Sequence, residues 1–397
     1  MRVLYLYMFP LWGNGSGAWL RRLTRQLSYK YPDSFEAGVV APDRRKLEFA
    51  KTFALEPEHK GVFVGNPELP GEKRYSAFTQ IEIIETINYY LLHTAKAIEK
   101  FKPDVLHIFH TAFLPAIGRT LANLYKIPFI ITTHGSDLYY FQEDNRFISL
   151  TRSASEKASY ITANSDFTKD WYLNLLGERF RRKTKVIPAG IDNNVEFNKD
   201  VTWIDKKYKF TRDRMVLFTG RLTEHKGVEY LIMAAKKINA EIVILGDGPE
   251  RHYLEQLVKK EKLTNVHILG YFSQRLGKID DFYLRADVYV APSVWKEPLG
   301  LVILEAMVNK TPVIVTMRGG VKTIVKDGEN GFLVRSKDAN VIAAKVNKLL
   351  QDEKLRKRMG ENAYKTVATK FNWDKIAAKF YNMYRRSLIK KNNHKKG

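Results

Sequence analysis

The stretch that decides the fold is Asp287-Val-Tyr-Val-Ala-Pro-Ser-Val-Trp-Lys-Glu-Pro-Leu-Gly-Leu-Val-Ile-Leu-Glu305. It opens with an apolar, β-branched run at 287–291, which predicts a buried strand. Glu297 then falls in a loop, and Pro298 is a favoured first residue of a helix, so we expect a helix to begin there. Glu305 lies just over two helical turns further on, which is roughly 12 Å of rise along the axis.

This spacing suits a nucleotide sugar, whose hexose and ribose are a similar distance apart. Backbone N–H groups near Gly300 and Leu301 would open the helix between the two carboxylates, and a helix N-terminus favours a diphosphate. The turn would offer Glu297 to sugar hydroxyls and Glu305 to ribose hydroxyls. The alternative is two solvated glutamates at an ordinary strand–helix junction, and this stretch alone does not decide between them.

Length and composition place limits on the class of protein. A chain of 397 residues is long enough for two domains, and 45% hydrophobic residues indicate a globular protein. The absence of cysteine excludes disulfides, thiolate metal sites and cysteine nucleophiles. No apolar run reaches the length of a membrane-spanning helix, and residues 1–9 read as a strand rather than a signal peptide. We therefore expect a cytoplasmic protein.

The net charge of +23 fits three kinds of partner: nucleic acid, an anionic membrane surface or a phosphorylated substrate. The charge is spread along the chain and no nucleic-acid motif accompanies it, so we expect no nucleic-acid partner. The segment 171–183 mixes aromatic residues, leucines and cations as interfacial helices do, although an ordinary amphipathic helix packed on its own domain is the favoured interpretation. Peripheral contact with an anionic inner membrane surface stays open.

Strand-like and helix-like segments alternate, which predicts parallel sheets covered on both faces. In the first half we expect strands at 3–8, 37–41, 105–109, 129–133, 160–163 and 185–188, and helices at 17–29, 76–101, 115–124 and 168–176. A polar segment at 193–212 reads as a linker or domain boundary. In the second half we expect strands at 215–219, 242–245, 266–269, 287–291 and 312–315, and helices at 227–238, 249–260 and 373–389.

The fold class is thus α/β, with two doubly wound Rossmann-like domains and a ligand cleft at the carboxyl ends of their strands. We expect an N-terminal domain at 1–198 and a C-terminal domain at 199–377. The helical end of the chain, about 378–397, would pack back on the first domain.

Several short motifs follow predicted strands at this edge. Gly13-Asn-Gly-Ser-Gly17 would let backbone amides approach a phosphate or a sugar, although a tight turn also explains the glycines. Thr132-Thr-His-Gly-Ser-Asp137 places His134 and Asp137 at the cleft, where a structural histidine is the alternative. Other candidate loops are Gly220-Arg-Leu-Thr-Glu-His-Lys-Gly227, Leu245-Gly-Asp-Gly-Pro249 and Arg318-Gly-Gly320.

Arg221 and Lys226 can converge on a diphosphate and stabilise its charge as it leaves. The chain has no Asp-x-Asp pair, so a carboxylate-held divalent metal on a nucleotide diphosphate is not indicated. It also lacks a Gly-x-Ser-x-Gly elbow and zinc-ligand spacing.

Together the motifs resemble the retaining glycosyltransferases of the GT4 family, which have the GT-B fold. Each match is weak singly, but their order and spacing are specific. They are Gly15-Ser-Gly17, His134-Gly135, Pro188-Ala-Gly-Ile-Asp192, Gly220-Arg221 with Lys226-Gly227, Gly246-Asp-Gly-Pro249, Pro292-Ser293, Glu297 through Glu305, and Gly328-Glu-Asn-Gly-Phe-Leu333.

The resemblance implies a role for each matching position. A UDP-, GDP- or ADP-linked sugar would be the donor, a sugar or glycolipid the acceptor, and no further cofactor or metal is implied. The implied catalytic residues are His134, Glu297, Arg221 and Lys226. The implied donor-binding residues are Gly15, Ser16, Gly17, Gly220, Arg221, Lys226, Gly246, Gly248, Glu297, Gly300, Leu301 and Glu305. Asp137 is the acceptor-binding candidate.

The sequence departs from the family pattern at two positions. Thr323 stands where members commonly carry a glutamate, which puts that side of the donor pocket in doubt, and Leu299 replaces a frequent phenylalanine. Two further enzyme hypotheses keep the two-domain cleft, a sugar-nucleotide epimerase and a phosphorylase. A basic nucleic-acid or membrane-surface module would explain the charge but not the ordered motifs.

Overall fold

The computed structural model describes residues 1–63, 73–272 and 279–393. They form two compact units, one of residues 1–190 with the C-terminal segment from Trp373 onward, and one of residues 191–372. The divisions thus fall at 190/191 and 372/373, a few residues before the expected 198/199 and 377/378.

The first unit is built on a seven-stranded parallel sheet. Its strands, in spatial order, are β3 (Lys51–Ala54), β2 (Glu36–Ala41), β1 (Arg2–Leu6), β6 (Val105–Phe109), β7 (Phe129–Thr133), β8 (Tyr160–Ala163) and β9 (Thr184–Val186). A separate two-stranded sheet pairs β4 (Gly61–Val62) with β5 (Lys73–Arg74). The central strands are buried on both faces, which is why they read as continuous apolar runs.

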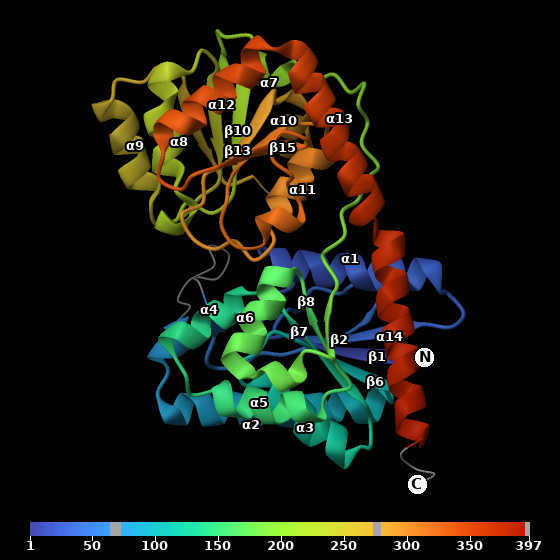
Figure 1. The fold of residues 1–397 in the computed structure, drawn as a ribbon. Helices are drawn as coiled ribbons and strands as arrows, with labels where there is room; N and C mark the ends of the chain where they lie inside the picture. Colours follow the sequence, from blue (N-terminus) through green and yellow to red (C-terminus); the bar gives the residue numbers. More distant parts are fainter. Residues whose placement is uncertain (64–72, 273–278, 394–397) are drawn as a thin grey trace. The chain divides into compact units, whose positions relative to one another are not determined.

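Helices cover both faces of this sheet. They are α1 (Gly15–Lys30), η1 (Tyr75–Ala77), α2 (Gln80–Phe101), α3 (Leu114–Leu124), α4 (Ser136–Glu143), α5 (Ile148–Lys157), α6 (Asp166–Leu176), η2 (Glu178–Phe180) and α14 (Trp373–Asn393). In Figure 1, α2, α3 and α5 lie together on one face, whereas α1 and α14 pack against each other. Apolar residues at a 3.6-residue period, including Trp373, Ile376 and Phe380, bury one side of α14.

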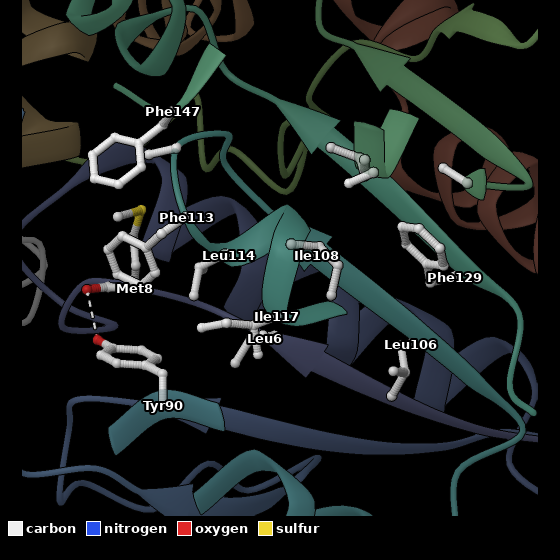
Figure 2. Close-up of a cluster of buried hydrophobic side chains, with 14 of the residues drawn as sticks. Leu6, Met8, Tyr90, Leu106, Ile108, Phe113, Leu114, Ile117, Phe129 and Phe147 are labelled. Atoms are coloured by element: carbon white, nitrogen blue, oxygen red, sulfur yellow. Dashed lines mark hydrogen bonds between the residues drawn. The ribbon is translucent and has the colours of Figure 1, made fainter. Parts of the chain in front are cut away.

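Figure 2 shows part of the apolar core between the sheet and the α2–α3 layer. Side chains of β1, β6 and α3 interdigitate there, among them Leu6, Ile108, Phe113, Leu114 and Ile117. The buried Tyr90 hydroxyl donates a hydrogen bond to the Met8 carbonyl oxygen at 3.2 Å, so the polar atom on this helix is satisfied inside the core.

The second unit has a six-stranded parallel sheet. Its order is β12 (Val266–Gly270), β11 (Glu241–Leu245), β10 (Met215–Thr219), β13 (Val288–Ala291), β14 (Val313–Thr316) and β15 (Gly331–Val334). Its helices are α7 (Trp203–Tyr208), η3 (Glu224–Lys226), α8 (Val228–Ala234), η4 (Ala235–Lys237), α9 (Arg251–Lys260), α10 (Ile279–Arg285), α11 (Leu301–Val308), η6 (Gly320–Thr323), α12 (Ala339–Gln351) and α13 (Glu353–Lys370). α8, α9 and α12 pack on one face, and α10, α11 and α13 on the other (Figure 1).

Two local expectations were wrong. The 193–212 segment contains α7, because Trp203 Nε1 donates a hydrogen bond to the buried Asp281 carboxylate at 3.0 Å and Ile204 is buried. The helix after β13 begins at Leu301 rather than Pro298, because Gly300 has a φ of 95° and lies outside right-handed helical space. Glu297 and Glu305 are therefore not spaced by two full turns of one helix.

Each sheet has a point where the strand order reverses. In the first unit β2 lies on one side of β1 and β6 on the other, and in the second unit β11 and β13 flank β10 in the same way. Loops leaving two such neighbouring strands diverge, which opens a crevice at their carboxyl ends. The loops at these two points carry most of the residues that the sequence singled out.

Candidate functional site

The best-defined candidate in the second unit is the carboxylate of Glu297, in the loop after β13. Glu297 is 8% exposed. Its Oε1 accepts a hydrogen bond from the Ser293 hydroxyl at 3.0 Å and forms an ion pair with Lys226 Nζ. Lys226 ends η3, in the loop after β10, so residues from the two strands at the switch point meet as expected.

The environment keeps this carboxylate charged. Burial of Glu297 would raise its pKa, but the charge of Lys226 and hydrogen bonds from Lys226 and Ser293 outweigh burial and hold the pKa below its ordinary value. The Lys226 ammonium also lies 5.5 Å from the centroid of the Trp295 ring, which provides a further favourable contact for the cation. A charged acceptor of hydrogen bonds is thus fixed beside a cation.

Backbone contacts hold the two loops together. Gly227 has a φ of 61°, and a Cβ atom there would run into the Pro292 carbonyl oxygen. The Val294 amide donates to the His225 carbonyl oxygen at 2.9 Å. Because only glycine allows this close approach, Gly227 is what lets Lys226 reach the loop after β13.

The Arg318-Gly-Gly320 motif reaches the same loop from β14. The Gly320 amide donates to the Glu297 carbonyl oxygen at 2.6 Å, and Gly319 lies against the same backbone. Thr323 ends the short η6 helix that follows and is partly buried. The motif thus supports the Glu297 backbone.

Glu305 lies in α11, the helix whose N-terminus Gly300 and Leu301 form. Its Oε2 accepts a hydrogen bond from the Tyr283 hydroxyl at 3.0 Å, and that hydroxyl also bonds Thr219 Oγ1 at 2.6 Å. Burial, and then the charge of Glu305, raise the pKa of Tyr283, so its hydroxyl stays protonated. Sequence reasoning missed Tyr283, which precedes β13 and resembles any core aromatic residue.

The remaining glycine motifs of this unit pack the loops after β10 and β11 together. The Gly220 amide donates to the Leu245 carbonyl oxygen at 3.0 Å. A Cβ atom at Gly246 would meet the Gly220 carbonyl oxygen, and one at Gly248 would meet that of Leu222. Arg221 lies in the same pair of loops and is partly buried.

In the first unit, Gly15–Gly17 form the first turn of α1, after the loop that follows β1. Asn14 caps the helix through a 2.7 Å hydrogen bond from the Gly17 amide. The Tyr7 hydroxyl donates to Asn14 Oδ1 at 2.6 Å and also bonds Ser16 Oγ at 2.8 Å. Ser16 is therefore held in a polar network beneath the loop.

His110, directly after β6, completes that network and was not singled out from the sequence. Its Nε2 lies 3.0 Å from Ser16 Oγ. The Ser16 hydroxyl is thus within hydrogen-bond distance of Tyr7, Asn14 and His110, and His110 Nδ1 has no hydrogen-bond partner among the described residues. The available signal was a polar His-Thr pair at the end of an apolar strand, next to the switch point.

The ring of His134 contacts that of His110, with centroids 4.6 Å apart and ring planes tilted by 41°. Burial lowers the pKa of each to about 3, and for His134 the nearby His110 adds to the effect. Both imidazoles are therefore neutral near pH 7 and can accept or donate hydrogen bonds without carrying charge.

Buried polar atoms without partners gather around these histidines. They belong to Trp19, whose ring centroid is 5.1 Å from that of His134, to Thr111, and to Asn164, whose Nδ2 donates to the His134 carbonyl oxygen at 3.1 Å. In the part of the chain that the structure describes, Trp19 Nε1, His110 Nδ1, Thr111 Oγ1, His134 Nε2 and Asn164 Oδ1 have no hydrogen-bond partner. Unsatisfied buried groups are costly, so this cluster is suited to a hydroxyl-bearing ligand.

Asp137 lies below this cluster and has no exposed surface. Its carboxylate accepts hydrogen bonds from the Thr111, His134 and Gly135 amides and from the Thr133 hydroxyl, at 2.7–3.1 Å. Three of these bonds reach Oδ1 and one reaches Oδ2, and the carboxylate is closed off from solvent. Asp137 therefore fixes the loops that carry His110 and His134, and any contribution it makes to acceptor binding is indirect.

The predicted site residues thus fall into two groups, one on each unit. In the first unit Gly15, Ser16, Gly17, His134 and Asp137 belong to one connected region. In the second unit Lys226 and Glu297 touch, Glu305 lies in the helix that follows, and Gly220, Arg221, Gly246 and Gly248 belong to the adjacent loops. Among the described residues, no helix is long and apolar enough to cross a membrane. The same residues contain no group of three or more histidine, aspartate or glutamate side chains that could hold a metal ion.

Comparison with known proteins gives the family. Residues 13–195 match the model of Glycosyltransferase Family 4, and residues 200–366 match that of Glycosyl transferases group 1. An uncharacterized glycosyltransferase of Methanocaldococcus jannaschii is 34% identical over 302 residues, which cover 72% of this chain and 75% of that protein.

Solved structures share the fold over nearly the whole chain. Sucrose-phosphate synthase from Thermosynechococcus elongatus has a TM-score of 0.79 at 21% identity, covering 97% of this chain and 98% of that one. HepE of Anabaena, in complex with UDP-glucose, has a TM-score of 0.73 at 19% identity, covering 97% and 100%. With the family models and the archaeal relative in agreement, this chain belongs to the family 4 glycosyltransferases, of the GT-B fold.

Proposed function

We propose that this glycosyltransferase moves a hexose from a nucleotide-diphosphate sugar to a hydroxyl of a sugar or glycolipid, with retention of the anomeric configuration and without a metal ion. The observation that carries the proposal is the ion pair of Lys226 and Glu297 at the switch point of the second sheet. HepE, a structural neighbour, was crystallised with UDP-glucose, which supports a nucleotide sugar as the donor.

The charges on the second unit match the parts of such a donor. The Glu297 carboxylate, held charged, would accept hydrogen bonds from sugar hydroxyls, and Glu305 would accept them from the ribose. Lys226, Arg221 and the amides at the start of α11 would bind the diphosphate. These cations and amides would stabilise the charge that develops as the diphosphate leaves.

In the proposed reaction the bond between the anomeric carbon and the phosphate oxygen breaks while the acceptor oxygen bonds to the same face of that carbon. The acceptor proton passes to the leaving phosphate, so no protein nucleophile is needed. The neutral His110 and His134 would orient the acceptor hydroxyl through their unsatisfied nitrogens. The proposal thus assigns donor binding to the second unit and acceptor binding to the first.

The first test is thermal unfolding of the purified chain with UDP-, GDP- and ADP-sugars in the presence of EDTA. A ligand that binds only the folded state raises its stability by about 2.7 kcal/mol at a hundredfold excess over its dissociation constant. We expect one nucleotide series to stabilise the wild type and to do so less in Lys226→Ala. Equal stabilisation of Lys226→Ala would contradict the assigned role of Lys226, and no stabilisation by any donor would contradict donor binding.

Transfer is tested on acceptor panels with the donor so identified. We expect Lys226→Ala to lose about 2–4 kcal/mol of transition-state stabilisation, measured from kcat/KM. The anomeric coupling constant of the product, measured by NMR at early times, tests retention. An inverted product would overturn the front-face mechanism while leaving donor binding intact.

A further inference from the structure

The loop before α1 contains a tryptophan that contacts two guanidinium groups. The Arg21 Cζ atom lies 4.7 Å from the centroid of the Trp12 ring, and the Arg45 Cζ atom lies 4.4 Å from it. Arg21 comes from α1 and Arg45 from the loop after β2, so three segments meet at the carboxyl edge of β1 and β2. All three side chains are partly exposed.

The carboxylate in this region is already committed to other donors. Asp43 is 7% exposed, and its Oδ1 accepts from the Arg45 amide and Nε at 3.0 and 2.9 Å. Its Oδ2 accepts from Arg45 Nη2 at 3.0 Å and from the Leu11 amide at 2.9 Å. With four hydrogen bonds a carboxylate is saturated, so Asp43 orients Arg45 but has no lone pair left for Arg21.

Arg21 is bound instead to a neutral partner, the Leu11 carbonyl oxygen. Burial of its guanidinium, and then the nearby Arg22 and Arg45 charges, lower the pKa of Arg21 to about 10, and the opposing effects of Tyr7 and Asp43 do not offset them. In the described residues no carboxylate forms an ion pair with Arg21. A partly desolvated cation next to further cations would be stabilised by an anion.

This cation adjoins the region that holds the unsatisfied histidine nitrogens. The Arg21 guanidinium is near enough to Tyr7 to act on its pKa, and the Tyr7 hydroxyl bonds Ser16, which in turn bonds His110. One ligand could therefore use both features, with a charged group on Arg21 and a hydroxyl toward His110 Nδ1, an atom that is buried and lacks a partner in the described chain.

We propose that Arg21, held against the face of Trp12, binds an oxyanion carried by the acceptor, either a phosphate or a carboxylate. The inference rests on the proposed transfer to an acceptor on this unit and narrows that acceptor to an acidic class. Arginine suits the task because its planar, permanently charged fork matches the geometry of such groups.

The binding test uses inorganic phosphate as the probe and the full chain. The thermal unfolding midpoint is measured at increasing phosphate concentration, with the ionic strength kept constant by chloride. This control is needed because a change in ionic strength by itself alters the interactions of surface charges. We expect a saturable stabilisation of the wild type that is lost in Arg21→Gln and partly retained in Arg21→Lys. Arg25→Gln is the matched control, because Arg25 is an exposed cation one turn further along α1 that contacts Tyr29.

The same stabilisation in Arg21→Gln as in wild type and Arg25→Gln would overturn the proposal. This readout needs no glycosyl transfer. If nucleotide sugars stabilise the protein but the effect of phosphate does not depend on Arg21, the anion site alone is contradicted. If phosphate stabilises the protein through Arg21 but no nucleotide sugar does, the anion site is supported and the proposed function is contradicted.

The transfer test compares an acidic acceptor with its neutral analogue, for example a sugar phosphate and the free sugar. Hydrogen bonds to charged groups contribute enough that we expect Arg21→Gln to raise the KM of the acidic acceptor by about 10- to 100-fold. The KM of the donor and of the neutral analogue should not change. A parallel series with a lipid-linked diphosphate acceptor in detergent distinguishes a lipid source of the anion from a soluble one. Equal effects on acidic and neutral acceptors would contradict the assignment.

Discussion

Lys226 and Glu297 stabilise each other unequally, because Glu297 is more buried than Lys226. The Glu297 side chain is 11% exposed and the Lys226 side chain is 23% exposed. A carboxylate left in that position without its cation would be desolvated and unpaired, whereas the lysine ammonium can reach water. The ion pair is thus needed mainly to keep the carboxylate charged.

A double-mutant cycle tests this asymmetry. Lys226→Met should destabilise the second unit by about 3–5 kcal/mol, because it leaves a buried charge, and Glu297→Gln should cost less. The double variant should recover part of the loss, since neither charge remains. Urea unfolding of the four proteins gives the coupling energy, and additive effects would mean that the pair does not interact.

The pH dependence of the cycle has a defined sign. The folded pKa of Glu297 lies below its unfolded value, so its contribution to stability is fully present above the unfolded pKa and is lost as the pH falls through the folded pKa. Without Lys226 the burial effect dominates and raises the folded pKa. Lys226→Met should therefore gain stability relative to wild type as the pH is lowered through the range in which Glu297 takes up its proton. A stability difference between the two proteins that stays constant over that range would contradict this prediction.

The loops after β10 and β13 meet because Gly227 has no side chain. Gly227→Ala adds a Cβ atom against the Pro292 carbonyl oxygen at a φ of 61°, so it should cost about 3 kcal/mol or more and displace Lys226. Gly328→Ala is the matched control, because its φ is 75° but nothing lies within 4 Å of the added atom. Its cost should be only about 1 kcal/mol of backbone strain. Similar thermal unfolding midpoints for the two variants would show that the contact between Gly227 and the Pro292 carbonyl oxygen does not affect stability.

Helix α14 is fixed to the first sheet by a buried hydroxyl. The Tyr384 hydroxyl bonds His107 Nδ1 at 2.8 Å and the Tyr5 hydroxyl at 3.1 Å. Tyr384→Phe leaves these groups unpaired and should cost about 1–3 kcal/mol. Tyr381→Phe, on the same helix, removes only an exposed bond to Ser34 and should change the free energy of unfolding by less than about 0.5 kcal/mol. If urea unfolding gives the same loss of stability for Tyr384→Phe and Tyr381→Phe, the buried hydrogen bonds of Tyr384 are not what fixes the helix.

Periodic elements were predictable, and contacts between elements were not. The strands at 105–109, 129–133 and 215–219 match the structure in full, because each is a short apolar run buried on both faces. By contrast, β3 (Lys51–Ala54) has an exposed or half-exposed pattern at the sheet edge and gave no apolar signal. The start of the helix after Glu297 was misplaced because a left-handed glycine overrode a favourable proline.

At the site, the sequence identified residues whose type is tied to chemistry. Glu297 and Lys226 are charged residues after predicted strands, and they meet because the sheet order brings their loops together. Tyr283 and His110 were missed because their roles arise from contacts with Glu305 and Ser16, which are distant in sequence. Asp137 was singled out correctly as a residue of this edge, but only the structure shows that backbone amides occupy its carboxylate.

At the scale of the whole molecule, the first unit buries three neutral histidines. Burial lowers the pKa of His107 far below its ordinary value and the pKa values of His110 and His134 to about 3. All three are ordinary histidines in the unfolded chain, which therefore binds more protons than the folded chain in mildly acidic solution. The first unit should be fully stabilised above the unfolded histidine pKa and lose stability as the pH falls below it.

The expected loss is up to about 1.4 kcal/mol per pH unit for each histidine, between about pH 6.5 and pH 3. Replacing His107 with glutamine, which keeps a donor and an acceptor for its bonds to Tyr384 and Thr132, should flatten this dependence even if it lowers stability at pH 7. The measurement is the free energy of unfolding of both proteins between pH 5 and pH 7.5. Parallel curves would mean that His107 has the same pKa in the folded and the unfolded chain, so that its burial does not contribute to the pH dependence.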